Sequence, residues 1–469
     1  MVEKPTSEVF ERATRTRIKA IADTPEAKRR ALAQHLTPPE VATLAVSLFS
    51  DAKMGLRCLD LGGGTGILSV ALLERYGTQI ERLDTIEIDP TLARIYDEEV
   101  RGHAGGKTVV GDALLVDADE DAVYDRVILN PPYKKMASDD SRQGHLPAHS
   151  ANLYSAFIMR GIDHLADGGE LVAIVPRSWT NGDYFAPFRR YALSECSLDA
   201  LHVYGSRNEI FADTNVLQET MIVRLSKRRQ ACTIRVSESV VKDAKPIVME
   251  YATRDLIVGD DLVVRTSPEE STSLSGTVES VGLCPSTGKV VDFRSRSYIT
   301  QEKPSERPAV PLIYVGNFPQ GQLKHPLSFG KGQWFCLDDD WAVKQVCEPG
   351  AYVLVKRFSA KEERRRVVAY PLVVSDPVAL ENHSSFLHQG RPRKVVPLRS
   401  SNLAYGLSLW LNSTFIDEWF RGVSGSTQVN AGDIKKMPCP SLDELENLGR
   451  EWSAGMEQEA IDEACEVLI

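Results

Sequence analysis

Residues 56–66 read Leu56-Arg57-Cys58-Leu59-Asp60-Leu61-Gly62-Gly63-Gly64-Thr65-Gly66. The first six have the length and apolar content of a buried strand, and the glycines open a helix expected over Ile67–Arg75. Glycines at a strand-to-helix turn let the backbone approach a ligand at the helix N-terminus. The spacing is G-x-G-x-G, not the dinucleotide fingerprint G-x-G-x-x-G. The stretch therefore predicts an α/β fold with a ligand-binding loop.

Polar side chains follow the next strands of this predicted sheet. Three more strands are expected, at residues 82–86, 108–110 and 124–129. They end in Glu87, Asp112 and Asn130, and Glu87 lies about 20 residues beyond the glycines, as a ribose-hydroxyl acceptor would. One such carboxylate alone is most simply a solvated loop group. A series of them at strand ends favours a ligand site, because parallel strands end at the same rim of a sheet.

The fourth strand leads into a stiff turn, Asn130-Pro131-Pro132-Tyr133. Each proline fixes its φ and lacks an N–H, so the turn holds an amide oxygen and a main-chain carbonyl as rigid acceptors beside an aromatic ring. Such a pair suits a planar substrate with an NH2 group, because gripping its hydrogens draws the nitrogen toward tetrahedral geometry. The bland alternative is an ordinary Asn-Pro turn. These four residues alone favour both interpretations about equally.

A second motif precedes the glycines. Thr37-Pro38-Pro39-Glu40 predicts a helix start, with Thr37 as N-cap, Pro38 at the first helical position and Glu40 completing a capping box. The apolar face expected for this helix is Val41, Leu44, Ala45 and Leu48. This motif is a strong indication of a helix start, but by itself it is only weak evidence for a ligand site.

The rest of the chain divides into further segments. Residues 1–35 are expected to form a helical arm, and residues 36–230 an α/β unit of seven strands that closes near 198–204 and 220–225. A long polar segment, 134–150, begins with Lys134 and Lys135. Short strands with more Pro, Gly and Ser predict a mixed α+β domain over 231–440, followed by a helical tail over 441–469.

Composition narrows the class of protein. The chain has 469 residues and a net charge of −10, which suggests several domains and argues against non-specific polyanion binding by the whole surface. Its apolar runs are far shorter than the roughly 20 residues of a membrane span, and its first residues lack a secretory signal, so a cytoplasmic protein is expected. The eight cysteines are scattered without Cys-x-x-Cys pairs, so no metal site or disulfide framework is expected.

Basic clusters and an amide-bearing loop occur in the second half of the chain. The loop holds Thr427, Gln428 and Asn430. The basic clusters are Arg294 and Arg296, Lys356 and Arg357, Arg364, Arg365 and Arg366, Arg391, Arg393 and Lys394, and Lys435 and Lys436. A charge run is usually a solvated face. Together with the loop, however, these clusters fit contacts to nucleic-acid phosphates and readout of base edges.

The motifs in this order resemble the gamma-class adenine-N6 DNA methyltransferases. The similarity is closest to the PstI-type enzymes of restriction–modification systems, with the TaqI-type more distant. It covers about residues 35–230 specifically and the loop 425–433 more loosely. One departure is Leu61-Gly62-Gly63, where many members of the class have Pro-Ala-Cys. The resemblance implies a Rossmann-like methyltransferase domain followed by a target-recognition domain.

The resemblance also implies roles for individual residues. S-adenosylmethionine would contact Thr37 and Pro38 at its methionine end, Asp60, Gly62, Gly64 and Gly66 along the loop, Glu87 at the ribose, and Ile88, Asp112 and Ala113 at the adenine. A flipped-out target adenine would be gripped by Asn130 and Pro131 in the Asn130–Tyr133 turn, which includes Pro132, and stacked between Tyr133 and Phe211. The implied partners are double-stranded DNA and, functionally, a restriction endonuclease. The DNA would be contacted by Lys134 and Lys135, and by the basic and amide residues within 391–394 and 427–436.

Other functions remain open on the sequence alone. The same turn occurs in enzymes that methylate a protein glutamine amide or an RNA base, but these typically lack a large domain after the catalytic one. Cytosine-N4 methyltransferases usually carry Ser in place of Asn130. A DNA-specificity module without catalysis would need no cofactor loop. No Asp…Glu-x-Lys cluster points to a fused nuclease.

Overall fold

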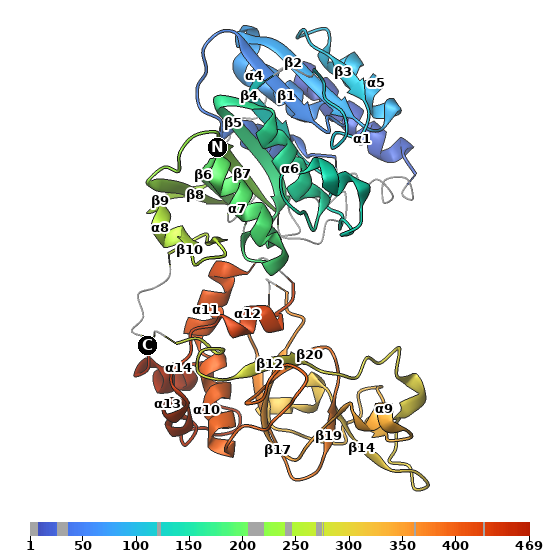
Figure 1. Cartoon of the computed structure of the whole chain (residues 1–469), viewed down its shortest axis with the longest axis vertical. Helices are drawn as coiled ribbons and strands as arrows, with labels where there is room; N and C mark the ends of the chain where they lie inside the picture. The colour runs from blue at the N-terminus through green and yellow to red at the C-terminus, as the bar shows by residue number, and fades with distance from the viewer. Residues whose placement is uncertain are drawn as a thin grey trace. The chain divides into compact units, whose positions relative to one another are not determined.

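The computed structural model describes residues 8–25, 36–119, 123–204, 220–239, 246–268, 274, 276–360, 363–424 and 427–469 (Figure 1). The chain forms two compact units, Met1–Pro268 and Glu269–Ile469. The first unit contains one large sheet with helices on both faces, and the second contains two smaller sheets and a group of helices.

The large sheet has nine strands within the described residues, in the order β3-β2-β1-β4-β5-β7-β6-β8-β9. Their bounds are β1 Leu56–Leu61, β2 Ile80–Glu87, β3 Thr108–Val110, β4 Tyr124–Leu129, β5 Leu165–Pro176, β6 Ser197–Tyr204, β7 Thr220–Ser226, β8 Thr233–Ser239 and β9 Ile247–Ala252. The pairings among β1–β5 are parallel, whereas β7 runs antiparallel to both β5 and β6. This is the expected Rossmann-like α/β architecture, and each of the seven expected strands is present.

The sheet does not end near residue 230, where the sequence-based boundary lies. Strand β8 pairs in parallel with β6, and β9 adds an antiparallel edge. Ile234 and Val236 of β8 are buried among polar neighbours, so the apolar signal of this strand is sparse. The first unit continues through α8 (Thr253–Leu256) and the short pair β10 (Ile257–Val258) and β11 (Val263–Val264).

Helices cover both faces of the sheet. On one face lie α3 (Pro39–Ser47), α4 (Ile67–Tyr76) and α5 (Pro90–Val100), and on the other lie α6 (Leu153–Asp163) and α7 (Ala186–Glu195). Strand β5 shows the period of two that this requires, because Leu171, Ala173 and Val175 pack on the α6 face while Val172 and Ile174 pack on the α4 face. All five are fully buried. The central strands are therefore apolar on both sides, as expected of a covered parallel sheet.

The N-terminal segment is not a detached arm over the residues described. Helix α1 (Glu8–Asp23) buries Phe10, Ala13, Arg17 and Ala20 and belongs to the core that contains α3, α4 and α5. Glu99 of α5 accepts hydrogen bonds from Arg12 Nε at 2.9 Å and Thr16 Oγ1 at 2.8 Å. The buried face includes two alanines and an arginine, so its sequence did not suggest a core-facing helix.

The second unit is a mixed α+β structure, as predicted. Its four-stranded antiparallel sheet has the order β12 (Cys284–Thr287), β20 (Ser384–His388), β17 (Gly350–Lys356) and β18 (Ala369–Val374). Its five-stranded sheet has the order β13 (Ile299–Thr300), β15 (Trp334–Cys336), β14 (Ala309–Ile313), β19 (Val378–Leu380) and β16 (Val346–Cys347). The helices are α9 (Asp340–Val343), α10 (Ser401–Leu411), α11 (Thr414–Val423), α12 (Ala431–Lys435), α13 (Leu442–Leu448) and α14 (Gln458–Glu466).

The last two helices pack into the second unit. Leu445 and Leu448 of α13 and Cys465 of α14 are buried in the same core as Trp410 of α10. The segment 441–469, expected as a separate helical tail, is therefore part of this unit. The eight cysteines are free thiols, and each except Cys232 is buried. No described helix has the length and apolar composition to cross a membrane.

Candidate active site

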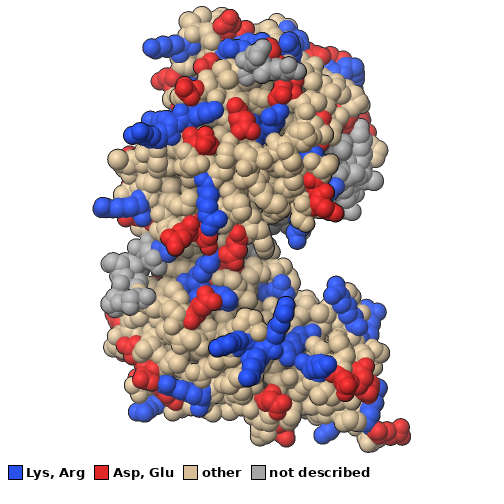
Figure 2. Space-filling view, in the orientation of Figure 1, with Lys and Arg blue, Asp and Glu red and all other residues tan. Residues whose placement is uncertain are grey.

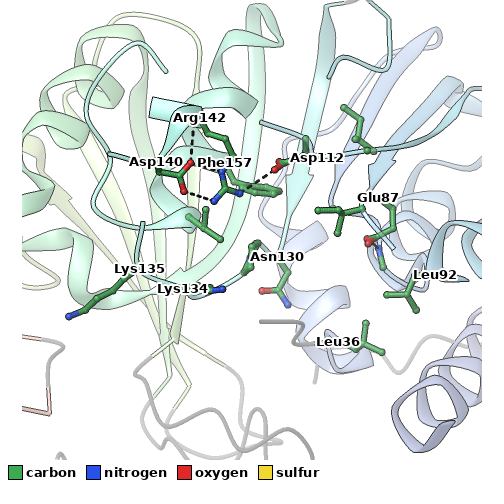
Figure 3. Close-up of a pocket in the computed structure, with 18 of the residues that line it drawn as sticks. Leu36, Glu87, Leu92, Asp112, Asn130, Lys134, Lys135, Asp140, Arg142 and Phe157 are labelled. Carbon is green, nitrogen blue, oxygen red and sulfur yellow. Dashed lines mark hydrogen bonds and ion pairs between the residues drawn. The ribbon is translucent and has the colours of Figure 1, made fainter. Parts of the chain in front are cut away.

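A cavity of about 430 Å³ opens at the carboxyl-end rim of the large sheet (Figure 3). Its wall is formed by the residues that follow β1, β2, β3 and β4, together with the loop after β4 and helix α6. The residues that line it include Leu36, Gly62, Gly64, Glu87, Ile88, Asp112, Ala113, Asn130, Pro132, Lys134, Lys135, Asp140, Arg142 and Phe157. The volume suits a small organic ligand. Three of the polar residues expected at strand ends, Glu87, Asp112 and Asn130, therefore line one cavity.

The glycines of the 62–66 loop have different structural tasks. Gly62 and Gly64 have φ of +87° and +56° and line the cavity. A Cβ on Gly62 would lie 3.7 Å from Phe157, and one on Gly64 would lie 3.4 Å from Leu36, both of which line the cavity. Gly66 has φ +84° and would place a Cβ 2.9 Å from Val100 of α5. Gly62 and Gly64 thus leave room for a ligand, whereas Gly66 lets α4 pack on α5.

Gly63 provides a test of this close packing. A Cβ on Gly63 would lie 2.3 Å from Thr85 Oγ1 and 2.8 Å from the Tyr96 ring. Gly63→Ala is therefore expected to lower the free energy of unfolding by about 1–3 kcal/mol, measured by urea titration. Gly102→Ala is the matched control, since nothing lies within 4 Å of its Cβ position. Equal stability of the two variants would contradict the packing argument.

Glu87 lies at the end of β2 with its carboxylate buried beside the cavity. Oε2 accepts the Gly64 N–H at 2.9 Å, and Oε1 accepts the Asp89 N–H at 2.8 Å. Burial raises the pKa of Glu87 above its ordinary value, and the two backbone donors oppose that rise. The carboxylate therefore ties the glycine loop to the end of β2. Each of its oxygens also has a second acceptor position.

Asp60 does not line the cavity. It is fully buried at the end of β1, where Oδ2 accepts the Ser69 hydroxyl at 2.7 Å and its carbonyl accepts the Thr85 hydroxyl at 2.8 Å. Burial raises the pKa of Asp60 to about 7. The structure thus places Asp60 beneath the glycine loop, where it supports α4 through Ser69. A direct contact with a ligand in the cavity is not part of this arrangement.

The pKa of Asp60 has a consequence for stability. Because its folded pKa of about 7 lies above the ordinary 3.8, the folded state holds this proton more tightly than the unfolded state. This contribution lowers the free energy of unfolding as pH rises from about 4 to 7. Asp60→Asn has no proton to lose, so its stability relative to wild type should improve by a few kcal/mol over that window. Urea titrations at pH 4 to 8 measure the difference, and a pH-independent difference would contradict the argument.

The Asn130 side chain is held from two sides. Its Nδ2 donates to Thr37 Oγ1 at 2.9 Å, and its Oδ1 accepts the Tyr133 hydroxyl at 3.0 Å. Thr37 is therefore not the N-cap that the sequence suggested. Pro38 is the N-cap residue of α3, and no side chain caps that end. Thr37 is buried, and its hydroxyl positions the Asn130 amide instead.

Tyr133 is partly buried and packs against the core on the α6 face of the sheet. Its hydroxyl lies 3.1 Å from the Ile174 carbonyl as well as near Asn130, and its ring meets that of Tyr154 edge-to-face at 6.3 Å. Burial raises the pKa of Tyr133, so the hydroxyl stays protonated and available as a donor. Pro131 is buried and Pro132 lines the cavity. Phe211, the second expected aromatic, lies outside the described residues.

Arg142 also lines the cavity, although the sequence indicated no role for it. Its guanidinium contacts Asp112 and Asp140 in the wall of the cavity (Figure 3). The only signal for it was its place in the long polar segment 134–150. Leu36 and Phe157 were also missed, since an apolar residue gives no sign of whether it lines a core or a cavity.

The expected DNA-binding residues are divided between the two units. Lys134 and Lys135 are exposed at the cavity in the first unit. In the second unit, the segment 427–429 pairs with the end of β17: Ser359 N donates to the Thr427 carbonyl at 3.0 Å, and Phe358 bridges to Gln428. Asn430 forms the capping box of α12 with Asp433, and Lys435 pairs with Glu279 at 2.9 Å.

The basic turn 391–394 lies elsewhere in the second unit. It follows the carboxyl end of β20, and Arg391 and Lys394 pair across this exposed turn. The 427–429 segment lies near the opposite end of β20, because its neighbour Arg357 bonds to residue 383 there. Of the 364–366 run, Arg366 is buried over the Phe420 ring and is not a surface charge. Figure 2 shows a group of Lys and Arg side chains on the visible face of the second unit.

Comparison with known proteins gives consistent matches. Residues 64–211 match the family model described as Eco57I restriction-modification methylase. The chain is 32% identical to the type II methyltransferase M.PstI of Providencia stuartii, with 93% of each chain covered. It is 34% identical to the type II methyltransferase M.BsuBI of Bacillus subtilis, with 89% of each chain covered.

Among solved structures, the type IIL restriction-modification enzyme MmeI in complex with DNA matches 98% of this chain and 73% of that chain. The TM-score is 0.58 and the sequence identity is 13%. At this identity the match shows a shared fold across both units.

Proposed function

This chain belongs to the type II methyltransferases of restriction–modification systems, and we propose that it transfers a methyl group from S-adenosylmethionine to the N6 amino group of an adenine in double-stranded DNA. The observation that carries the proposal is the position of Asn130. Its amide lines the same cavity as the strand-end carboxylates of Glu87 and Asp112. A grip for an amino group and a site for a nucleoside cofactor would therefore be adjacent.

The cavity fits S-adenosylmethionine in its volume and in the carboxylate groups that line it. Glu87 would accept the ribose hydroxyls, and Asp112 with Ala113 and Ile88 would hold the adenine, since these residues line the cavity at successive strand ends. The missing side chains of Gly62 and Gly64 leave space that a Cβ would fill. Thr37, Pro38 and Asp60 lie outside the wall, so they would act by shaping the loops. When bound, the cofactor supplies a methyl group activated by a positively charged sulfur.

Asn130 would act on the target adenine. Its Oδ1 and the Pro131 carbonyl would accept the two hydrogens of the N6 amino group and bring the nitrogen lone pair out of conjugation with the ring. Thr37 keeps the Asn130 amide in one orientation, because it accepts from Nδ2 at 2.9 Å. A strong general base is not required, since the proton becomes acidic only as the new bond forms. The adenine must leave the duplex to reach this turn, at a cost of a few kcal/mol, and Tyr133 and Phe211 would stack on it.

DNA recognition would be shared between the units. Lys134 and Lys135 are exposed beside the target turn and would contact phosphates there. In the second unit Thr427, Gln428 and Asn430 would read base edges, while Arg391, Arg393, Lys394, Lys435 and Lys436 would contact the backbone. The biological role would be protection of host DNA against a cognate restriction endonuclease.

Methyl transfer from labelled S-adenosylmethionine to unmethylated bacterial DNA, followed by modification-sensitive sequencing, tests the proposal. N6-methyladenine at one short motif is the expected result. Methylation at cytosine N4 would contradict the proposal that adenine is the target base. Label that enters only RNA or protein would contradict the proposal that DNA is the substrate. DNA binding with no cofactor binding and no transfer would point to a specificity module without catalysis.

A further inference from the structure

Arg142 joins two carboxylates across the wall of the cavity (Figure 3). Its Nε and Nη2 donate to the two oxygens of Asp140 at 2.9 and 2.7 Å, and its Nη1 donates to Asp112 Oδ2 at 3.1 Å. The hydrogen bonds from Arg142 hold the pKa of Asp140 at about 2. Its side chain is 25% exposed and that of Asp112 is 21% exposed, so the pair is partly shielded from water. The planar guanidinium is suited to bridging two acceptors in this way.

The segment that carries Arg142 is ordered by its own contacts. Asp140 accepts the Arg142 N–H and caps a short 3-10 helix, η2 (Ser141–His145). Gln143 bonds to the Ala137 carbonyl at 3.1 Å and to the Ser150 carbonyl at 2.7 Å. The segment is joined to α6 by a hydrogen bond from Leu153 N to the Lys134 carbonyl at 2.8 Å. Arg142 therefore projects toward Asp112 from a fixed base.

Asp112 has room for a further donor in this arrangement. Its Oδ1 accepts Leu114 N at 3.0 Å and its Oδ2 accepts Arg142 at 3.1 Å. A carboxylate offers about four acceptor positions, so these bonds fix its plane and leave positions for a third donor. Both oxygens of Asp112 act as acceptors in these two bonds, so the carboxylate presents acceptor positions to the cavity. An accepting carboxylate favours a base with an amino group over one with a carbonyl in the same place.

We propose that Arg142 is the positioning residue that fixes Asp112 and so makes the cofactor site selective for an adenine base. The inference rests on the proposed function, because it takes the cavity as the site of S-adenosylmethionine. In this assignment Arg142 acts through Asp112, which would hold the adenine of the cofactor, whereas methyl transfer would take place at Asn130. Its loss is therefore expected to change cofactor affinity and base selectivity much more than the rate of transfer from saturated enzyme.

Calorimetry on the full chain tests this with S-adenosylhomocysteine and S-inosylhomocysteine, which has a carbonyl in place of the N6 amino group. Wild type is expected to prefer the adenosine compound by at least about 30-fold. In Arg142→Met, the Kd for S-adenosylhomocysteine should rise about tenfold, and the preference for it over S-inosylhomocysteine should shrink to a few-fold. The KM for S-adenosylmethionine should also rise about tenfold, while kcat should change less than about threefold. The Kd and the base preference of Arg142→Lys should lie between those of wild type and Arg142→Met. The lysine ammonium keeps the positive charge but lacks the planar set of donors that bridges the two carboxylates.

Arg94→Met is the matched control, because it removes an exposed arginine–carboxylate pair with Glu98 on α5 and leaves the cavity wall unchanged. Folding of each variant is checked by thermal unfolding. Unchanged Kd and selectivity in Arg142→Met, or an equal loss for both compounds, would overturn the inference while leaving the proposed function intact. Failure of wild type to bind either compound would overturn the proposed function itself.

Discussion

Asn130→Ala is expected to slow methyl transfer by at least about 10³-fold while leaving the Kd for S-adenosylhomocysteine within about twofold of wild type. The substitution removes the Oδ1 acceptor that would grip the target amino group, an interaction that strengthens as the nitrogen becomes tetrahedral. It also removes the donor to Thr37 at 2.9 Å, which holds the amide in place. Single-turnover transfer to DNA and calorimetry measure the two quantities separately.

Two further variants separate the role of the amide from a general loss of structure. Thr37→Val keeps the shape of the buried side chain but removes the acceptor for Asn130 Nδ2, so a smaller loss, about tenfold, is expected. Asn447→Ala changes an exposed asparagine of α13 and should leave transfer unchanged. Retained transfer in folded Asn130→Ala would refute the assigned role of this residue.

The sequence predicted the central sheet well because its strands are apolar on both faces and are bounded by glycine, proline or acidic residues. Strand β3 (Thr108–Val110) and strand β4 (Tyr124–Leu129) have the predicted bounds. Strand β8 was missed because Ile234 and Val236 alternate with polar residues. The burial of helix α1 was missed because Ala13 and Arg17, on its buried face, carry no apolar signal from the sequence.

Placement of the site followed from topology, but side-chain contacts did not. Parallel strands bring Glu87, Asp112 and Asn130 to one rim whatever the details of packing. The sequence could not show that Asp60 is sealed beneath the glycine loop, because a strand-end acid reads the same whether it faces a ligand or a core. Nor could it show that Thr37 bonds to a residue 93 positions away. Arg142 was missed for the same reason, since its partner Asp112 is 30 positions away.

Glu87→Ala is expected to weaken binding of S-adenosylhomocysteine by about 100-fold or more. The carboxylate would accept the ribose hydroxyls, and charged hydrogen bonds of this kind contribute about 1.5–3 kcal/mol each. The same substitution leaves the N–H groups of Gly64 and Asp89 without the oxygens they bond to at 2.9 and 2.8 Å, so the glycine loop should also loosen. The free energy of unfolding should fall by about 1–3 kcal/mol as a result. Calorimetry and urea titration measure the two effects.

Glu87→Gln distinguishes the two contributions to this loss. The amide keeps one oxygen that can accept Gly64 N or Asp89 N, but its NH2 group then faces the other backbone donor. Cofactor binding should therefore be weaker than in wild type and stronger than in Glu87→Ala. Glu98→Gln on the exposed side of α5 controls for the change in charge. If Glu87→Ala bound the cofactor within threefold of wild type, Glu87 would be a support for the glycine loop and would not bind the ribose.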